Sequence, residues 1–502
     1  MKKLLILLSI FFVLSACSKL EDLNTNPKGF TTVPASGIFN GVVRTFFDQM
    51  STFNVNNNNT ELFVQHFAET TYPDESHYDM VTRTIPGNHM NRLCRNVLMN
   101  LKEAKKVIEA LPAGSISPAL KANQLAIVEI LSCYAWSTLV ETFGDIPYTE
   151  ALDYNKPTPK YDDGLTVYKD VIARLTAAVA SMDKTEAGMG AGYDNIFGGE
   201  VDGTVQWMRF ANSLKLRMGL MLADKDAAAS VTTVNSALAG EGVFVPGDKF
   251  AMTFLPDAPN QNTVYQDVVA SGRDDFVVTS TLVDKMNALN DPRREGYLWT
   301  TVGGVYKGGK QGMANAWASS THIDKDLLLP TREVVLMDYV EVEFLLAEAA
   351  ARKAGGIAYG SVGTPKEHYD KAIMASVQYW GSSDVLASIY LAQLGVDYNT
   401  LTVTNAKPWK EVIGTQAWIA YYMRGLSAWT SWRRLDYPRL TASPESVLTG
   451  GKMPVRYIYP VSEQTLNATS YAAAATAIGG DLATTPLFWD TFVYNTVTGA
   501  DI

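Results

Sequence analysis

The segment from Lys121 to Phe143 has the spacing of a helix that is apolar on two faces. Its apolar residues form two sets: Leu125, Val128, Ala135 and Leu139, then Ile127, Ile130, Leu131 and Tyr134. A helix of this kind must be covered on both faces, so it belongs between other helices rather than at a surface. The sequence therefore predicts a fold of stacked helical layers.

Helical periodicity continues along most of the chain. Residues Val335 to Ala354 repeat apolar positions at alternating spacings of four and three. Further helices are predicted at about 37–50, 89–111, 164–182, 204–224, 365–381 and 411–433. Strand-like runs are scarce, as at Val243 to Val245, and no repeat of fixed period stands out. The predicted fold class is mainly all-α.

Composition limits how the chain is stabilised and what it binds. It is 47% apolar and 19% charged, which is typical of a globular protein with a sizeable core. Cys94 and Cys133 lie in apolar helical patterns, which favours buried free thiols, although spacing alone leaves a disulfide open. The net charge of -10 makes nucleic acid and anionic lipid head groups poor partners.

The N-terminus has the pattern of a bacterial lipoprotein signal. Lys2 and Lys3 precede an apolar run too short to span a bilayer, and Leu14-Ser15-Ala16-Cys17 ends it with small residues and a cysteine. We expect residues 1–16 to be a signal peptide, Cys17 to carry lipid, and residues 17–36 to be a tether; an ordinary secretory signal is the alternative. The anchor would then hold the protein on a membrane that it does not span.

Residues from about 250 to 330 differ in composition from the helical segments. Glycine, asparagine and aromatic residues crowd together there, most densely from Gly303 to Gly312, and a similar stretch runs from Tyr72 to His89. Loops on a rigid scaffold commonly carry binding residues, and tryptophan and tyrosine offer flat faces to sugar rings or extended peptides. The predicted ligand contacts are Tyr72, His77, Tyr78, Tyr297, Trp299, Tyr306 and Trp317. The aromatics expected in the core are Trp136, Trp207, Trp418 and Tyr421.

Several chemical motifs are incomplete. Gly304 to Lys310 has the spacing of a nucleotide-binding loop, but Gln311 replaces the hydroxyl that would hold Mg²⁺. The five histidines are scattered, so no metal site and no cofactor are predicted. Asp162-Asp163-Gly164 and Asp194-Asn195 are interpreted as turns and helix caps rather than calcium ligands.

An enzyme is not predicted. A glycosidase needs two carboxylates across a cleft, and Asp274, Asp275 and Glu295 lie in the loop-rich region, so sequence alone leaves that possibility open. Adjacent acids in a polar loop are usually solvated, and the chain contains no Gly-x-Ser-x-Gly elbow. No catalytic residue is assigned.

A series of motifs resembles the SusD/RagB family of outer-membrane lipoproteins, in its SusD-like branch. In chain order they are Phe143-Gly144-Asp145-Ile146-Pro147-Tyr148, Trp207 to Arg217, Asn290-Asp291-Pro292-Arg293, Phe344 to Ala349, Trp432-Arg433-Arg434 with Tyr437-Pro438, and Pro454-Val455-Arg456 with Tyr459-Pro460. The resemblance covers most of the chain. We interpret these motifs as fold markers and not as ligand contacts.

The resemblance implies four tetratricopeptide-like helix pairs in a right-handed superhelical scaffold, with residues 37–502 as one SusD-like domain. It also implies a surface-exposed outer-membrane lipoprotein that captures oligosaccharides as the lid of a SusC-like TonB-dependent transporter. Acidic Glu21 and Asp22 after Cys17 resemble the surface-export signal of Bacteroidetes-type lipoproteins. Peptide cargo, a surface glycoside hydrolase and an adhesin are the alternatives. The family's glycan contacts lie in variable loops, so none carries over by position.

Overall fold

The computed structural model describes residues 33–300, 303–492 and 494–499. The predicted signal peptide at 1–16, Cys17 and nearly all of the tether at 17–36 lie outside the described residues. The division into signal, tether and one domain therefore stays a prediction.

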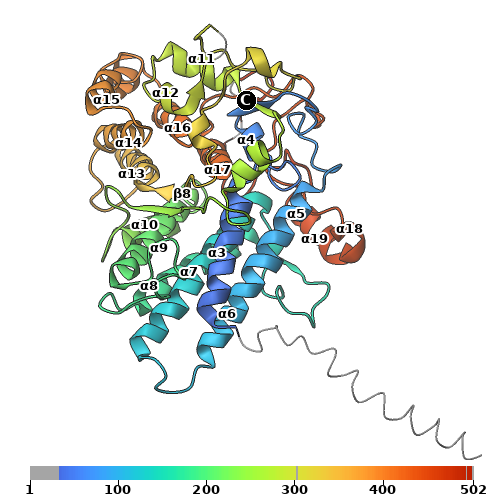
Figure 1. Cartoon of the computed structure of the whole chain (residues 1–502), viewed down its shortest axis with the longest axis vertical. Helices are drawn as coiled ribbons and strands as arrows, with labels where there is room; N and C mark the ends of the chain where they lie inside the picture. Colours follow the sequence, from blue (N-terminus) through green and yellow to red (C-terminus); the bar gives the residue numbers. More distant parts are fainter. Residues whose placement is uncertain (1–32, 301–302, 493, 500–502) are drawn as a thin grey trace, which may run out of the picture.

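Four helix pairs make up most of the scaffold within the described residues. They are α3 (Ala35–Ser51) with α6 (Met99–Glu109), α7 (Pro118–Phe143) with α8 (Gly164–Ser181), α9 (Val201–Met221) with α10 (Ala227–Ala237), and α13 (Tyr339–Ala354) with α14 (Pro365–Tyr379). Successive pairs touch through α6 and α7, α8 and α9, and α9 and α13. Figure 1 shows the first pairs low in the molecule and α13 and α14 above them. The prediction of a mainly helical fold with tetratricopeptide-like pairs is confirmed.

Helix α7 lies at the centre of this arrangement. It begins after Ser117, whose side chain accepts a hydrogen bond from the backbone N–H of Leu120, and it contacts both α6 and α8. By length and composition it is the one helix among the described residues that could cross a membrane, yet 89% of its most apolar window is buried inside the fold. The two-faced apolar pattern therefore belongs to a core helix.

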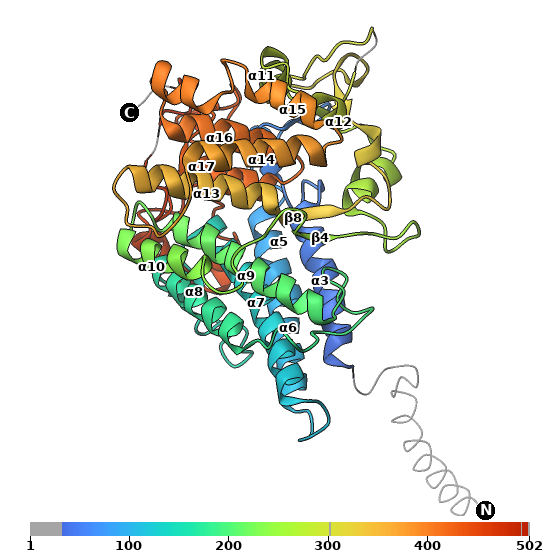
Figure 2. The same ribbon diagram turned by 90° about the vertical axis from the view of Figure 1, so that its left-hand side faces the viewer.

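The remaining helices lie mostly in the upper half of the molecule (Figure 2). They are α4 (Thr60–Phe63), α5 (Ile85–Asn91), α11 (Ser280–Ala288), α12 (Arg294–Tyr297), α15 (Asp384–Leu391), α16 (Trp409–Ala420), α17 (Gly425–Leu435), α18 (Glu463–Leu466) and α19 (Ala468–Ala477). π-Helical turns span Arg92–Leu98, Tyr265–Ala270 and Thr400–Thr404, and 3₁₀ turns span Trp317–Ser319 and Lys325–Leu327.

The strands are short and pair antiparallel. The pairs are β1 (Phe67–Glu69) with β5 (Phe276–Val278), β2 (Ile146–Pro147) with β3 (Tyr161–Asp162), β4 (Lys249–Met252) with β8 (Val334–Asp338), and β6 (Leu298–Trp299) with β7 (His322–Ile323). The β1–β5 and β4–β8 pairs join the loop-rich region to strands outside it, whereas β6 and β7 both lie within the region.

Two predicted helices have wrong limits. The helix predicted at 335–354 starts only at Tyr339, because residues 334–338 form β8; Asp338 caps α13 by accepting from the backbone N–H of Glu341 at 2.9 Å. The helix predicted at 411–433 is two helices, because the chain turns between Tyr421 and Arg424. The strand expected at Val243 to Val245 is also wrong, since β4 begins at Lys249.

The motifs interpreted as fold markers lie in the core. Arg293 is fully buried and pairs with Asp291 at 2.6 Å. Arg434 meets Glu348 at 3.0 Å, and Arg352 meets the same carboxylate at 2.8 Å. A buried arginine of this kind needs a paired carboxylate, because an unpaired charge in the interior is costly. The Arg434–Glu348 pair joins α17 to α13, whereas the other two pairs lie within α13 and within the segment before α12.

The aromatic residues expected in the core, Trp136, Trp207, Trp418 and Tyr421, are all buried. Cys133 is a buried free thiol as expected, whereas Cys94 is a free thiol that is only half-buried. Asp163 caps α8, accepting from the backbone N–H of Thr166 at 2.8 Å. Asp194 accepts from two backbone N–H groups at 3.0 Å and from the indole N–H of Trp207 at 2.7 Å. Both acids are thus caps and turns, as predicted.

Candidate ligand-binding cleft

Trp299 and Trp317 line the same cleft in the loop-rich region. Its volume is about 640 Å³, within the usual range of small-molecule sites. The lining is mostly apolar, with a few polar groups. Its residues are Val268, Val269, Gly272, Asp274, Phe276, Trp299, Thr300, Trp317, Ala318, His322, Ile323, Lys325 and Leu328.

The β6–β7 pair and a 3₁₀ turn place the two tryptophans. Trp299 in β6 lies opposite His322 in β7, so their side chains are cross-strand neighbours. The His322 ring stacks on Trp317 with centroids 3.6 Å apart and planes 17° from parallel. His322 Nε2 also hydrogen-bonds the carbonyl oxygen of Trp317 at 2.7 Å. His322 therefore lies between the two tryptophans and fixes the position of one of them.

Both tryptophans keep a large part of their surface in water. Trp299 is 49% exposed and Trp317 is 40% exposed, whereas most tryptophans of the chain are buried. The ammonium group of Lys325 lies 5.5 Å from the Trp299 ring centroid, where it interacts with the electron-rich face. The cleft thus offers flat apolar faces beside a cation and the carboxylate of Asp274.

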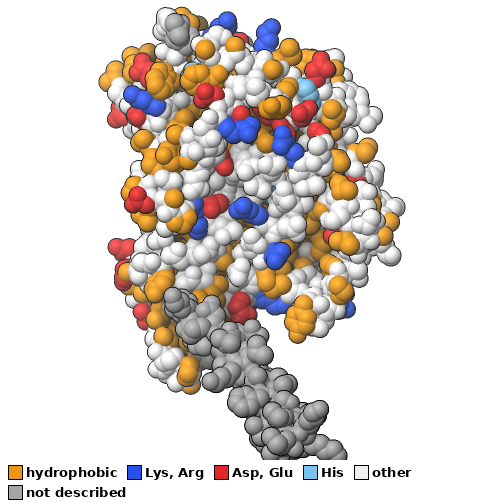
Figure 3. Space-filling view, turned by 45° about the vertical axis from the view of Figure 1, so that its right-hand side comes forward, with side chains coloured by type: hydrophobic (Ala, Val, Ile, Leu, Met, Phe, Trp, Pro, Cys, Tyr) orange, Lys and Arg blue, Asp and Glu red, His pale blue; other side chains and the backbone are white. Residues whose placement is uncertain are grey.

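Figure 3 shows one face of the molecule with its side chains coloured by type. Hydrophobic groups there lie in small clusters between polar and charged ones. Isolated exposed apolar residues are normal on soluble proteins. The paired tryptophans of the cleft are therefore the more informative feature.

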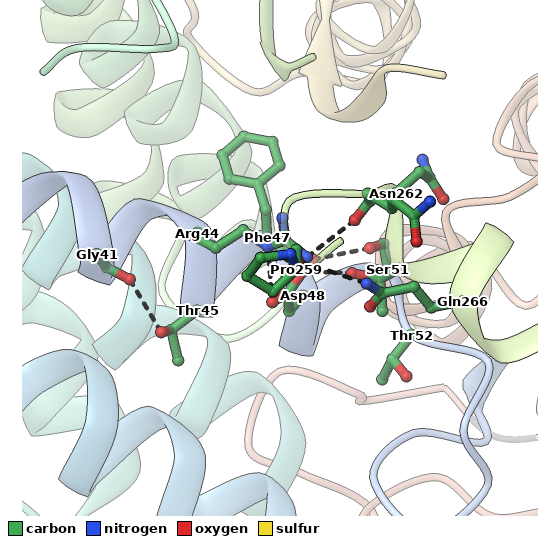
Figure 4. A network of polar contacts seen from close by, with 12 residues as sticks. Gly41, Arg44, Thr45, Phe47, Asp48, Ser51, Thr52, Pro259, Asn262 and Gln266 are labelled. Carbon is green, nitrogen blue, oxygen red and sulfur yellow. Dashed lines mark hydrogen bonds and ion pairs between the residues drawn. The ribbon is translucent and has the colours of Figure 1, made fainter. Parts of the chain in front are cut away.

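Helix α3 holds one wall of the cleft. Arg44 pairs with Asp48 at 2.9 Å and donates to the carbonyl oxygen of Gln261 at 2.9 Å. Thr263 donates to Asp48, and Thr52 donates to Asp267 at 2.6 Å. Figure 4 shows this junction between α3 and the segment after Pro259. The π-helical turn that carries Val268 and Val269 is thereby fixed to the scaffold.

A smaller cavity adjoins the cleft at Phe276, which lines both. This second cavity, called the polar pocket below, has a volume of about 230 Å³. Its lining includes Asn54, Asn56, Glu69, Thr71, Tyr72, Glu75, Arg83, Gln266, Asp267, Ser271, Arg273 and Asp275. Tyr72 is 68% exposed at its mouth. Burial raises the pKa of Glu69 to about 9, with nearby Glu75 adding to the rise and a hydrogen bond from Ser76 opposing it.

The predicted contacts Tyr78 and Tyr297 are not at the surface, so the expectation for these two is wrong. Tyr78 is fully buried, and its hydroxyl accepts from the backbone N–H of Ser443 at 3.1 Å. Tyr297 is fully buried, stacks on Tyr422 with centroids 4.4 Å apart, and donates to the carbonyl oxygen of Ile419 at 2.8 Å. Both rings pack against segments more than a hundred residues away in the chain.

His77 and Tyr306 are half-buried and lie outside both cavities' linings. His77 Nε2 hydrogen-bonds the carbonyl oxygen of Gly312 at 2.9 Å. The Tyr306 ring has the guanidinium of Arg294 5.7 Å from its centroid. These contacts give both residues structural roles, and a ligand role for them stays a prediction.

The glycine-rich segment is partly a packing feature. A Cβ at Gly308 would lie 2.4 Å from the carbonyl oxygen of Thr279, and one at Gly312 would lie 1.8 Å from Ser443 Oγ. Gly309 exchanges backbone hydrogen bonds with residues 278 and 280 at 2.8 and 2.7 Å. Glycine is needed here because the segment runs close to its neighbours.

The carboxylates considered for a glycosidase do not form a pair across the cleft. Asp274 is the one carboxylate among the described residues that line it. Asp275 lines the polar pocket instead and pairs with Arg273 at 2.5 Å. Hydrolysis of a glycosidic bond by the usual route needs two carboxylates facing the same bond. Likewise, no group of three or more potential metal ligands occurs among the residues the structure describes.

Sequence reasoning missed several cleft residues. His322, Lys325, Val268 and Val269 carry no motif, and Asp274 was considered only as a possible acid of an enzyme. His322 joins the site through strand pairing with Trp299, which no local pattern predicts. The exposed tryptophans in a loop-rich segment were the one usable signal.

A helical scaffold that holds an aromatic cleft in its loops defines a binding protein, and the comparisons with known proteins give its family. Residues 27–460 match the SusD-like family described as "Starch-binding associating with outer membrane". The chain belongs to this family. Its members bind carbohydrate and are not enzymes, and the family is associated with the outer membrane.

Solved structures share the fold at low sequence identity. A chitin-binding protein is 24% identical with a TM-score of 0.75, covering 91% of this chain and 100% of its own. A chitin-binding SusD homolog from Flavobacterium johnsoniae is 23% identical with a TM-score of 0.74, covering 91% and 99%. A SusD homolog from Bacteroides uniformis is 22% identical with a TM-score of 0.73, covering 90% and 99%. No curated protein sequence matches the chain.

Proposed function

We propose that this protein is a surface-exposed, lipid-anchored lipoprotein that captures oligosaccharides in the cleft of Trp299 and Trp317. The pairing of two half-exposed tryptophans in one cleft carries this proposal. Sugar rings present flat patches of C–H groups with hydroxyls at their edges. Tryptophan faces suit the patches, and polar groups at the rim suit the hydroxyls.

The cleft binds without chemistry. The rings of Trp299 and Trp317 cover the apolar faces of a sugar, and Asp274 and Lys325 are positioned to exchange hydrogen bonds with its hydroxyls. His322 keeps Trp317 in place, so less side-chain freedom is lost when a ligand binds. The cargo is then released intact to a partner.

That partner is proposed to be a SusC-like TonB-dependent transporter, with this protein as its lid. A lipid at Cys17 and a tether at 17–36 would keep the lid attached while it opens. Copurification from detergent-solubilised outer membranes tests this role, and an affinity-tagged chain is expected to bring down a β-barrel protein. Capture of a host protein with no barrel would instead favour an adhesin.

Binding measurements on an oligosaccharide panel test the proposed function. The panel contains malto-oligosaccharides and chitin oligosaccharides, because the family is described as starch-binding and two structural neighbours bind chitin. We expect saturable binding of at least one series, with the sugar recovered uncleaved. Binding of extended peptides but of neither sugar series would refute oligosaccharide cargo, and release of shorter sugars would refute binding without catalysis.

A further inference from the structure

The polar pocket and the aromatic cleft lie on two sides of one short segment, residues 273–276, which leads from a turn into β5. Asp274 lines the cleft, its neighbours Arg273 and Asp275 line the polar pocket, and Phe276 lines both. Alternation of this kind is expected of an extended chain, whose successive side chains point to opposite sides. The segment is held by Thr70, which bonds the carbonyl oxygens of Asp274 at 2.5 Å and Asp275 at 2.9 Å.

The pocket's charges are internally paired. Arg273 pairs with Asp275, and Arg83 pairs with Glu75. The carboxylate of Asp267 accepts hydrogen bonds from the hydroxyl of Thr52 at 2.6 Å and from two backbone N–H groups at 2.9 and 3.2 Å. The raised pKa of Glu69, caused mainly by burial, keeps that carboxyl protonated at neutral pH. The pocket is therefore rich in hydrogen-bonding groups without a strong net charge.

Paired arginine and carboxylate groups match neighbouring hydroxyls. A hydroxyl donates and accepts at once, so it can donate to Asp275 while it accepts from Arg273. The ring of Tyr72 at the pocket mouth adds an exposed aromatic face. An acidic group here would face Asp275 and Glu75, whereas a neutral hydroxylated unit would meet both signs of charge.

We propose that the polar pocket is a second subsite for a neutral, hydroxyl-bearing unit of the same oligosaccharide that stacks in the Trp299–Trp317 cleft. This proposal rests on the proposed function and narrows its substrate class. The ligands are neutral oligosaccharides long enough to reach from the cleft, past Phe276, into the polar pocket. The cleft contributes affinity to every ligand, and the polar pocket contributes only to longer ones.

Titration calorimetry with oligomers of two to six units tests this directly, using the malto-oligosaccharide and chitin series. The variants are Tyr72→Ala with Arg273→Ala in the pocket and Trp317→Ala in the cleft. The control is Arg95→Ala, an exposed arginine outside both cavities. We expect the pocket variant to bind the hexamer about tenfold more weakly than the unmodified protein does, which equals about 1.4 kcal/mol of binding free energy. Its affinity for the dimer should be unchanged. Trp317→Ala should weaken binding at every length.

The outcomes separate the two proposals. If neither series binds to the unmodified protein, the proposed function fails and the subsite proposal fails with it. If the sugars bind and depend on Trp317, but the pocket variant loses nothing or loses the same factor at every length, only the subsite proposal is overturned. A series of galacturonate oligomers that gains more affinity with length than the neutral series would overturn the preference for neutral units.

Discussion

Replacing Trp299 or Trp317 with alanine is the sharpest test of the cleft, because the expected loss follows from exposure. A tryptophan presents up to about 250 Å² of surface, and the 49% exposure of Trp299 leaves about 120 Å² in water. A sugar ring that covers half of this area contributes about 1.5 kcal/mol at about 25 cal/mol per Å². Each single variant should therefore bind about tenfold more weakly, and the double variant about a hundredfold.

Calorimetric titration against chitin and malto-oligosaccharides measures the loss, and thermal melting measures the fold. Full burial of a tryptophan is worth about 3–5 kcal/mol on truncation to alanine, so these half-exposed residues should cost clearly less stability. Tyr154→Ala is the matched control, since that ring is 91% exposed and lies outside the cleft lining. Folded single variants with unchanged affinity would refute the role of the cleft, and a stability loss as large as for a core tryptophan would refute its exposure.

Three further outcomes are expected. Cys17→Ala should release the protein from the membrane fraction, and continued sedimentation with outer membranes would contradict the anchor. Because burial raises the pKa of Glu69 to about 9 from an ordinary 4.5, the folded state keeps a proton that the unfolded chain loses between these values. The stability that this proton confers is complete below about pH 4.5 and declines as the pH rises to about 9. In Glu69→Gln, the free energy of unfolding measured with denaturant should therefore depend less on pH across that window. An unchanged dependence on pH would contradict this. Asp194→Ala should cost about 3 kcal/mol in urea unfolding, because it strands the buried indole N–H of Trp207 and two turn amides.

The helical scaffold was predictable because its signal is local and repeated. Apolar spacing located α3, α7, α8, α9 and α14 to within a few residues. The same spacing failed at Val335, since a short apolar run fits a buried strand as well as a helix. It failed again before Gly425, where a Cβ would lie 2.7 Å from the backbone nitrogen of Glu61. This close approach of α17 to α4 depends on tertiary packing, which the spacing of apolar residues does not reveal.

The cleft was only partly predictable for a related reason. Exposure of an aromatic depends on what packs over it, and Tyr78 and Tyr297 are covered by residues remote in sequence. Trp299 and Trp317 look no different from Tyr297 in their local sequence, yet they face water. The positions of His322 and Lys325 beside them follow from the β6–β7 pairing and the 3₁₀ turn after it.

Helix α3 is the first described helix of the chain. Asp48 within it and Thr52 directly after it hydrogen-bond the segment that forms one wall of the cleft. Helix α3 thereby connects the start of the described chain to the segment that carries Asp267, Val268 and Val269. Because these hydrogen bonds fix that segment, a shift of α3 would also displace this wall of the cleft.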